Sequence, residues 1–202
     1  MAVNEPVYDN MIQERDVMVP MRDGTRMAAD VYRPRTDDPV PVIFSRTPYN
    51  FASWRDGQFS SGTYRRAWEA VRRGYAYVVM NERGRFYSEG EWDILGTPLT
   101  DSWDAFEWME NQPWSNGKVG TLGCSSTAEW QMAAASLDHP AHATLVAQGF
   151  GAGVGCSVTG GQPAAAGDHQ GEGDVVLLVA DAAGHVLHDR DRHPPGQARC
   201  CV

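Results

Sequence analysis

Short apolar runs alternate with stretches of helical spacing along the chain up to about residue 150. Continuous apolar runs of this length are typical of strands that are buried on both faces of a sheet. They predict strands over 40–46, within 75–84, and over 118–123 and 143–149. Apolar positions at helical spacing predict helices over 62–74, 100–114 and 125–137. Strands that alternate with helices predict right-handed crossovers and a mostly parallel sheet covered on both faces.

The ends of these elements carry recognisable signals. Gly74 is a C-terminal cap for the first helix, and Thr100 or Asp101 is an N-terminal cap for the second. Residues 16–34 show a different pattern, in which two extended runs flank Arg22-Asp23-Gly24-Thr25. Because Asp-Gly tolerates the positive φ angles of a tight turn, this segment predicts an antiparallel hairpin, which we expect at the sheet edge. The predicted fold class is therefore α/β.

Composition divides the chain at about residue 155. All twenty aromatic residues lie in residues 1–155, whereas residues 156–202 contain none and carry four of the six histidines. A segment without aromatic residues can bury little side-chain surface, apart from the apolar run at 175–180. We expect a globular domain over 1–155 and a low-order tail over 156–202. We interpret the tail as non-native or out-of-frame translation.

Charge and cysteine content exclude several classes of function. A net charge of −9 disfavours binding to nucleic acid or to anionic membranes, both of which need basic patches. No apolar run is long enough to span a bilayer, and the first residues show no signal-peptide pattern. The cysteines fit no disulfide framework; they are Cys124, Cys156, Cys200 and Cys201. A cytoplasmic location is therefore expected.

The candidate chemistry lies at the junction of the third predicted crossover, where Gly123-Cys124-Ser125 joins a strand to a helix. A serine is a poor nucleophile at its free pKa, so it must be presented on a strained turn to a base. This junction is the setting of a nucleophile elbow, and the backbone N–H of Ser126 would then face the developing oxyanion. The alternative is that Ser125 only caps the helix.

Four stretches together resemble one family of enzymes. They are RDGTRMAADVYRP (22–34), PVIFSRTPYN (41–50), GYAYVVMNERGRFYSEGEW (74–92) and DSWDAFEWMENQPWSNGKVGTLGCSSTAEWQMAA (101–134). Their order and spacing resemble the cocaine esterase, α-amino-acid ester hydrolase and X-Pro dipeptidyl-peptidase group of α/β-hydrolases, over residues 12–155. The resemblance implies the N-terminal half of an α/β-hydrolase fold, which would be incomplete in this chain. It also implies cleavage of ester or amide bonds through an acyl-enzyme.

The resemblance also implies roles for individual residues. The family nucleophile, in a Gly-x-Ser-Tyr-x-Gly stretch, falls on Ser125, with Ser126 in place of the Tyr and Ala128 in place of the last Gly. A second oxyanion donor, the tyrosine hydroxyl of an Arg-x-Pro-Tyr stretch, falls on Tyr49. The alternative for Tyr49 is a buried tyrosine with another hydrogen-bond partner.

Other residues of these stretches have structural interpretations. Arg83 and Arg85 either orient the loop that follows their strand or form local ion pairs at the surface. Trp103, Phe106 and Trp108 are expected in the core rather than around a substrate.

A triad in this fold runs in the order Ser, acid, His, so both partners of Ser125 must follow it. Asp138, His139 and His142 follow too closely to return to the serine, and we expect them in a loop or at the surface. The tail contains histidines and aspartates that could act as base and acid, or could form a zinc site together with two cysteines. Neither arrangement matches a known spacing template. The residues are Asp181, His185, His188, Asp189, His193, Cys200 and Cys201. The glycine-rich stretch at 149–155 is no dinucleotide fingerprint.

The expected function is therefore that of a serine hydrolase acting on a small-molecule ester or peptide-like substrate, with no cofactor and no metal ion. Two alternatives remain at this point. One is a catalytically inactive truncated fragment that lacks the acid and the histidine, and the other is a non-catalytic interaction module.

Overall fold

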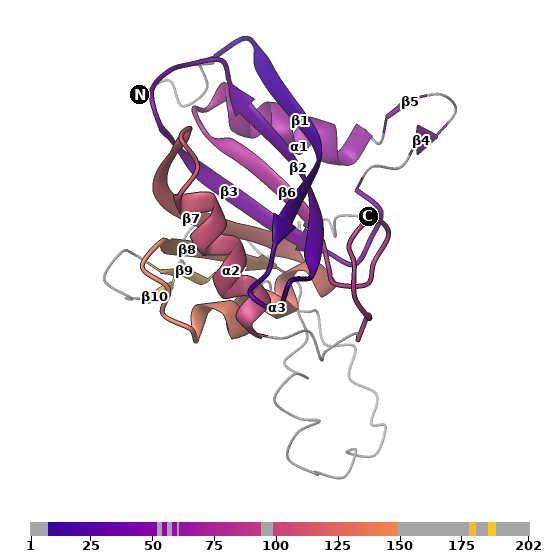
Figure 1. The fold of residues 1–202 in the computed structure, drawn as a ribbon. Helices are drawn as coiled ribbons and strands as arrows, with labels where there is room; N and C mark the ends of the chain where they lie inside the picture. The colour runs from indigo at the N-terminus through magenta and orange to yellow at the C-terminus, as the bar shows by residue number, and fades with distance from the viewer. Residues whose placement is uncertain are drawn as a thin grey trace, which may run out of the picture.

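The computed structural model describes residues 8–51, 54–55, 58–59, 61–93, 99–148, 178–180 and 186–188. A six-stranded sheet in the order β1-β2-β6-β3-β7-β8 forms its centre (Figure 1). The strands are β1 (Met11–Pro20), β2 (Arg26–Pro34), β3 (Val40–Thr47), β6 (Ala76–Asn81), β7 (Ser115–Cys124) and β8 (His142–Gln148). The helices are α1 (Ser61–Arg72), α2 (Leu99–Glu110) and α3 (Ser126–Ala135). Four short strands form two separate antiparallel pairs, β4 (Trp54–Arg55) with β5 (Gln58–Phe59) and β9 (Leu178–Ala180) with β10 (Val186–His188).

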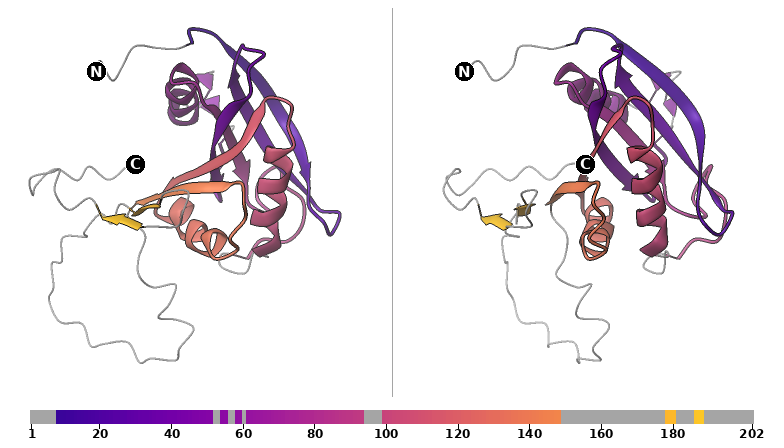
Figure 2. Two further views of the ribbon diagram at one scale, coloured as in Figure 1. Left: turned by 90° about the vertical axis from the view of Figure 1, so that its left-hand side faces the viewer. Right: turned by 60° about the vertical axis from the view of Figure 1, so that its left-hand side comes forward.

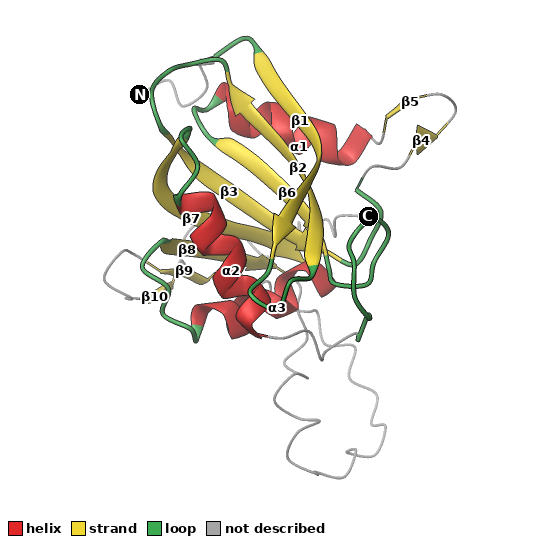
Figure 3. Cartoon of the chain, in the orientation of Figure 1, coloured by secondary structure: helices red, strands yellow, loops and turns green. Residues whose placement is uncertain are grey.

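The predicted alternation of strands and helices is confirmed in type and order (Figure 3). β6, β3, β7 and β8 run parallel to one another, β2 pairs antiparallel with β6, and the antiparallel hairpin of β1 and β2 lies at one edge as expected. The boundaries differ from the prediction. The predicted helices end too late, since α2 ends at Glu110 and α3 at Ala135, and β1 begins at Met11 rather than near residue 16.

The turn of the hairpin follows the predicted chemistry. Gly24 has a φ of 86°, and the backbone N–H of Thr25 donates to Oδ1 of Asp23 at 3.0 Å. Met21 and Thr25 close the turn with a backbone hydrogen bond of 2.8 Å. A residue with a Cβ adopts this φ rarely, so glycine favours the turn here.

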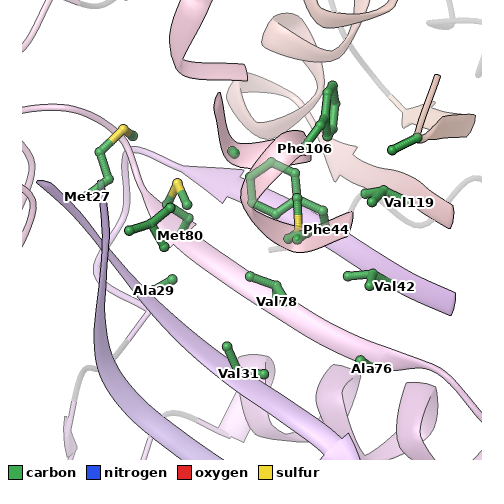
Figure 4. Packing of buried hydrophobic residues seen from close by; sticks show 14 of the residues in the cluster. Met27, Ala29, Val31, Val42, Phe44, Ala76, Val78, Met80, Phe106 and Val119 are labelled. Atoms are coloured by element: carbon green, nitrogen blue, oxygen red, sulfur yellow. The ribbon is translucent and has the colours of Figure 1, made fainter. Parts of the chain in front are cut away.

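Helices cover both faces of the sheet, as predicted. α1 and α2 lie on opposite faces (Figure 2), and α3 shares the face of α2. On the α2 face, Phe44 of β3 and Phe106 of α2 pack edge to face with ring centres 6.1 Å apart (Figure 4). On the other face, Ala67 and Val71 of α1 pack against the tyrosines of β2 and β6. The predicted position of Phe106 in the core is thereby confirmed.

The parallel strands bring three loops to one edge of the sheet. Thr47, the last residue of β3, pairs with Asn81, the last residue of β6, and β7 lies parallel on the other side of β3. Because the carboxyl ends of parallel strands meet at the same edge, the loops that follow these strands lie side by side. This edge holds Tyr49, residues 82–92 and Ser125.

The predicted tail, 156–202, lies outside the described residues apart from β9 and β10. The glycine-rich stretch at 149–155 also lies outside them. None of the helices in the described part of the chain is long and apolar enough to cross a membrane.

Candidate active site

Ser125 lies alone between the end of β7 and the start of α3. Its φ is 56° and its ψ is −128°, a conformation that is costly for a residue with a Cβ, and its side chain is exposed. The backbone holds this conformation, because the N–H of Ser125 donates to the carbonyl of Gln148 at 2.9 Å and its own carbonyl accepts from Ala128 at 2.7 Å. Ser125 occupies the N-cap position of α3, but its side chain makes no capping hydrogen bond, so the alternative that the side chain serves only to cap the helix is wrong.

Close contact with α3 explains the glycine before the turn. A Cβ on Gly123 would lie 2.0 Å from the carbonyl oxygen of Thr127 and 2.8 Å from Nε2 of Gln131. Thr127 closes the turn further, because its Oγ1 accepts from the N–H of Cys124 and donates to the carbonyl of the same residue, both at 2.7 Å. The sequence therefore produces a turn that presents the serine outward.

Ala128 stands where the resembled family has a glycine. It is fully buried and packs with Leu145 and Ala147 of β8. The methyl group thus fills the contact between α3 and the sheet. The departure from the family pattern is compatible with the turn at Ser125.

Tyr49 follows β3 and reaches toward the same turn. Its hydroxyl lies 3.3 Å from Oγ of Ser126, and its side chain is 58% exposed. The alternative of a buried tyrosine is therefore wrong. The structure brings together all three residues that the sequence singles out, Tyr49, Ser125 and Ser126.

Two buried ionisable side chains, Arg46 and Glu82, lie near the ends of β3 and β6. Arg46 of β3 is almost fully buried, with its guanidinium 4.8 Å from the ring centre of Trp130 and NH1 3.0 Å from Oγ of Ser102. Burial lowers the pKa of Arg46, and burial raises the pKa of Glu82, while the charge of each group opposes the shift of the other. The carboxylate of Glu82 also accepts a hydrogen bond from Nε1 of Trp92 at 3.2 Å.

Arg83 is buried, so the interpretation of Arg83 as a surface residue is wrong. Its guanidinium donates to both carboxylate oxygens of Asp101 at 2.9 and 2.6 Å, to Oγ1 of Thr25 at 2.6 Å, and pairs with Asp23 at 2.8 Å. Hydrogen bonds to Asp101 are the main cause that raises the pKa of Arg83. Arg83 thus ties the loop after β6 to α2 and to the hairpin turn.

The predicted caps of α2 are also wrong. The helix already begins at Leu99, so Thr100 and Asp101 lie within its first turn. The fully buried Asp101 carboxylate serves the Arg83 ion pair. Sequence reasoning missed this pair because its members are 18 residues apart and belong to different elements.

Two histidines near the end of α3 are far from the serine. His142 pairs with Val119 in register, six residues before Ser125, which places it roughly 20 Å away at about 3.3 Å per residue. His139 lies in the loop after α3 as expected, but it is buried, with its ring centre 4.4 Å from that of Trp103, whereas His142 begins β8 and is not in a loop. Asp138 lies in the loop as expected, with a φ of 52°.

Burial favours the neutral form of both rings. His142 stacks on Phe106 at 4.7 Å and its Nε2 is hydrogen-bonded to Oγ1 of Thr121 at 3.1 Å. Burial lowers the pKa of His142 to about 4, and burial lowers the pKa of His139 as well. These residues therefore support the core rather than the serine.

The tail residues named as a base, an acid or zinc ligands lie outside the residues whose side chains are described. Within residues 8–51, 62–93 and 100–148, no three His, Cys, Asp or Glu side chains are grouped to hold a metal ion.

Comparison with known proteins places this geometry among hydrolases. The cocaine esterase of Rhodococcus sp. (strain MB1 Bresler) is 42% identical over 125 residues, which cover 60% of this chain and 21% of that protein. Among solved structures, an α-amino-acid ester hydrolase matches 71% of this chain and 26% of its own with a TM-score of 0.57 and 27% identity. A CocE/NonD family hydrolase from Staphylococcus aureus matches 69% of this chain and 28% of its own, with a TM-score of 0.56 and 26% identity.

The described residues form part of an α/β-hydrolase fold. The chain spans about a fifth of the length of the curated relatives it matches. The model of the family described as X-Pro dipeptidyl-peptidase (S15 family) matches residues 23–183. The chain therefore belongs to the S15 family of X-Pro dipeptidyl-peptidases.

Proposed function

We propose that the protein is a serine hydrolase that cleaves ester or amide bonds through an acyl-enzyme, with Ser125 as the nucleophile. The observation that carries this proposal is the backbone of Ser125, held at φ 56° with an exposed side chain at a strand-to-helix junction. A strained, outward-facing serine is costly to fold and is expected where its hydroxyl must meet a substrate.

The reaction assigns a role to each group at the turn. Oγ of Ser125 attacks the acyl carbon, and negative charge develops on the carbonyl oxygen. The N–H of Ser126, at the start of α3, and the hydroxyl of Tyr49 would donate to this oxyanion. The C–O or C–N bond then breaks, and the leaving oxygen or nitrogen takes up the proton that the base removed from Ser125, so an alcohol or an amine departs. Water then hydrolyses the ester on Ser125 and releases the acid.

The proton of Ser125 needs a base. Among the residues with described side chains, the two histidines lie near the opposite end of β7 and β8, so neither supplies it. The base and the acid that orients it would therefore come from outside the described residues. This arrangement agrees with the chain order of triads in the fold, in which both follow the serine.

The substrate is proposed to be a small-molecule ester or a peptide-like amide. The support is the identity to a protein named cocaine esterase and the membership of a family named for dipeptidyl-peptidase activity. No role for a nucleic acid or a membrane surface is proposed, given the net charge of −9. The cytoplasmic location stays a prediction.

A fluorophosphonate probe tests the nucleophile, with peptide mapping to find the labelled residue. If the residues after 148 supply the base and the acid, we expect labelling of Ser125 in the wild type and none in Ser125→Ala, along with a fall in p-nitrophenyl ester turnover on the order of 10⁵–10⁶-fold. If residues 156–202 are out-of-frame, as proposed below, the base and the acid are missing and turnover should hardly exceed the background. Ser136→Ala is the matched control, since it removes an exposed hydroxyl just after the far end of α3, away from the turn at Ser125.

Labelling of a different serine, or turnover unaffected by Ser125→Ala, would contradict the proposal. Wild-type protein that neither takes up the probe nor exceeds the background rate would favour the alternative of a catalytically inactive chain.

We propose in addition that residues 156–202 are non-native or out-of-frame. The support is the loss of every aromatic residue after residue 155. The family match, which runs on to residue 183, argues against the proposal. The nucleotide sequence after codon 155, read in all three frames, tests this. A single intact frame in independent isolates would rule it out.

A further inference from the structure

The loop that carries Tyr49 is held through three consecutive carbonyl groups. Nδ2 of Asn81 donates to the carbonyl of Tyr49 at 2.8 Å and to that of Thr47 at 3.4 Å. Nε of Arg85 donates to the carbonyl of Pro48 between them at 3.0 Å. All of these donors come from the end of β6 and the loop that follows it. The backbone of residues 47–49 is therefore tied to a neighbouring strand at each residue.

The anchoring of this backbone contrasts with the exposure of the side chain that it carries. The N–H of Tyr49 donates to Oγ1 of Thr47 at 3.0 Å, which closes the loop on itself. The side chain is 58% exposed, and its one described hydrogen-bond partner is Oγ of Ser126 at 3.3 Å. Since few packing contacts restrain an exposed phenol, its position depends on where its backbone is fixed.

Asn81 has the contacts of a dedicated donor. It is fully buried at the end of β6, and its own carbonyl accepts from Oγ of Ser88 at 2.9 Å, which fixes its backbone. Its Nδ2 donates two hydrogen bonds, whereas its Oδ1 has no hydrogen-bond partner in the described structure. An unpaired buried acceptor is unfavourable. An apolar residue would fill the space without this penalty, so the amide is explained by its donor group.

Arg85 supplies the second anchor and is itself held by aromatic rings. Its guanidinium lies 4.5 Å from the ring centre of Trp92 and 5.1 Å from that of Phe86. These contacts limit the freedom of a long side chain near the surface. The Pro48 carbonyl therefore accepts a hydrogen bond from a side chain whose position is restrained.

We propose that Asn81 is a positioning residue that, together with Arg85, fixes the Thr47–Tyr49 backbone so that the Tyr49 hydroxyl faces the turn at Ser125 in one geometry. This proposal adds a residue to the proposed hydrolase site, and its expected effect on kcat rests on the proposed function. Its structural part, the fixed position of the Tyr49 ring, does not depend on activity. Preorganised donors stabilise an oxyanion better than donors that must first be ordered.

The structural part is tested by ¹⁹F NMR of the protein labelled with 3-fluorotyrosine, with the Tyr49 signal assigned by its loss in Tyr49→Phe. We expect a single narrow signal in the wild type. Asn81→Leu, which keeps the side-chain size but removes the donor, should broaden or split the signal and move it toward the value of free tyrosine. Asp104→Asn is the matched control, because it breaks a distant ion pair with Arg22 and should leave the Tyr49 signal unchanged.

The catalytic part is tested by a double-mutant cycle on p-nitrophenyl ester hydrolysis. Asn81→Leu should lower kcat by about 10–100-fold with little change in KM, because a misplaced donor loses part of its effect on the transition state. In a Tyr49→Phe background the same substitution should change kcat less than about twofold, since the group that it positions is already gone. A merely structural role would lower activity equally in both backgrounds.

The outcomes separate this proposal from the proposed function. An unchanged Tyr49 signal in folded Asn81→Leu, or equal losses of kcat in both backgrounds, overturns the positioning role. A changed signal in a protein without Ser125-dependent turnover supports the positioning role and contradicts the hydrolase function. If Asn81→Leu does not fold, Arg85→Met removes the second anchor from a half-exposed site. The same shift of the signal is then expected, and its absence overturns the proposal.

Discussion

Gly123 shows how strictly a single position can be set by its surroundings. A Cβ at this position would lie 2.0 Å from a backbone oxygen of α3, which cannot move aside like the end of a flexible side chain. Gly123→Ala should therefore displace α3 or unfold the protein, with a loss of unfolding free energy of about 3 kcal/mol or more. Thermal unfolding followed by circular dichroism measures this loss.

Gly62 of α1 provides the control, because a Cβ there would meet no atom within 4 Å and its φ is not positive. Gly62→Ala should leave the melting temperature unchanged or raise it slightly, since alanine favours a helix. Equal melting temperatures for Gly123→Ala and the wild type would show that the turn is looser than described.

His142 makes stability depend on pH in a defined window. Burial lowers its folded pKa to about 4, with a further contribution from the nearby His139, while a backbone hydrogen bond with Thr144 opposes the shift. Above about pH 6.5 the ring is neutral in both states. As the pH falls toward 4, the unfolded chain binds a proton that the folded protein excludes, so stability is lost by up to about 3 kcal/mol.

Urea unfolding at pH 7.5 and pH 4.5 measures this loss, and His142→Phe is the comparison, since it keeps a ring against Phe106 without a titrating group. We expect the variant to show a smaller difference between the two pH values than the wild type. An equal difference in both proteins would assign the pH dependence to other groups, such as His139, whose pKa burial also lowers.

At the level of elements, the Arg83 and Asp101 pair joins the loop after β6 to α2. The Asp101 carboxylate is fully buried, and the Arg83 side chain is 10% exposed. Removing Asp101 leaves the buried Arg83 charge with only the half-exposed Asp23 as an acidic partner, so Asp101→Ala should lower the unfolding free energy by about 3 kcal/mol. Chemical denaturation measures the change.

The control is the exposed pair of Arg73 and Glu69 on α1, where Glu69→Gln should hardly change stability because solvent screens both charges. A similarly small effect of Asp101→Ala would mean that water reaches Arg83 in its place.

The elements themselves were largely predictable because each depends on a local pattern. The apolar runs of β3 and β6 and the helical spacing of α1 are properties of neighbouring residues, and the structure confirms them. The strand ends were not predictable in this way. β7 begins at Ser115, which pairs with Val40 of β3. The hydrophobic pattern within 115–124 carries no information about this partner, which lies in a different segment.

Across the whole molecule, the sheet order predicts a gradient of local stability. β6 and β3 have strand partners on both sides and β6 is buried at every residue, whereas β1 and β8 end the described sheet. Amide hydrogen exchange should therefore be slowest in β6 and β3 and faster in β1 and β8. Mass spectrometry of peptides from each strand measures the order. Slower exchange in β1 than in β6 would contradict it.

The sequence alone determined the α/β class, the edge hairpin and the serine at the turn, because strand and helix periods, the Asp-Gly turn and Gly-x-Ser at a junction are encoded by adjacent residues. It also pointed to Tyr49 through a resemblance. Only the tertiary structure decided which distant groups meet: Asn81 with the carbonyl of Tyr49, Arg83 with Asp101, and the rings of His139 and His142 with those of Trp103 and Phe106. These contacts depend on strand order and register, which bring residues together from separate segments and leave no periodic signal in the chain.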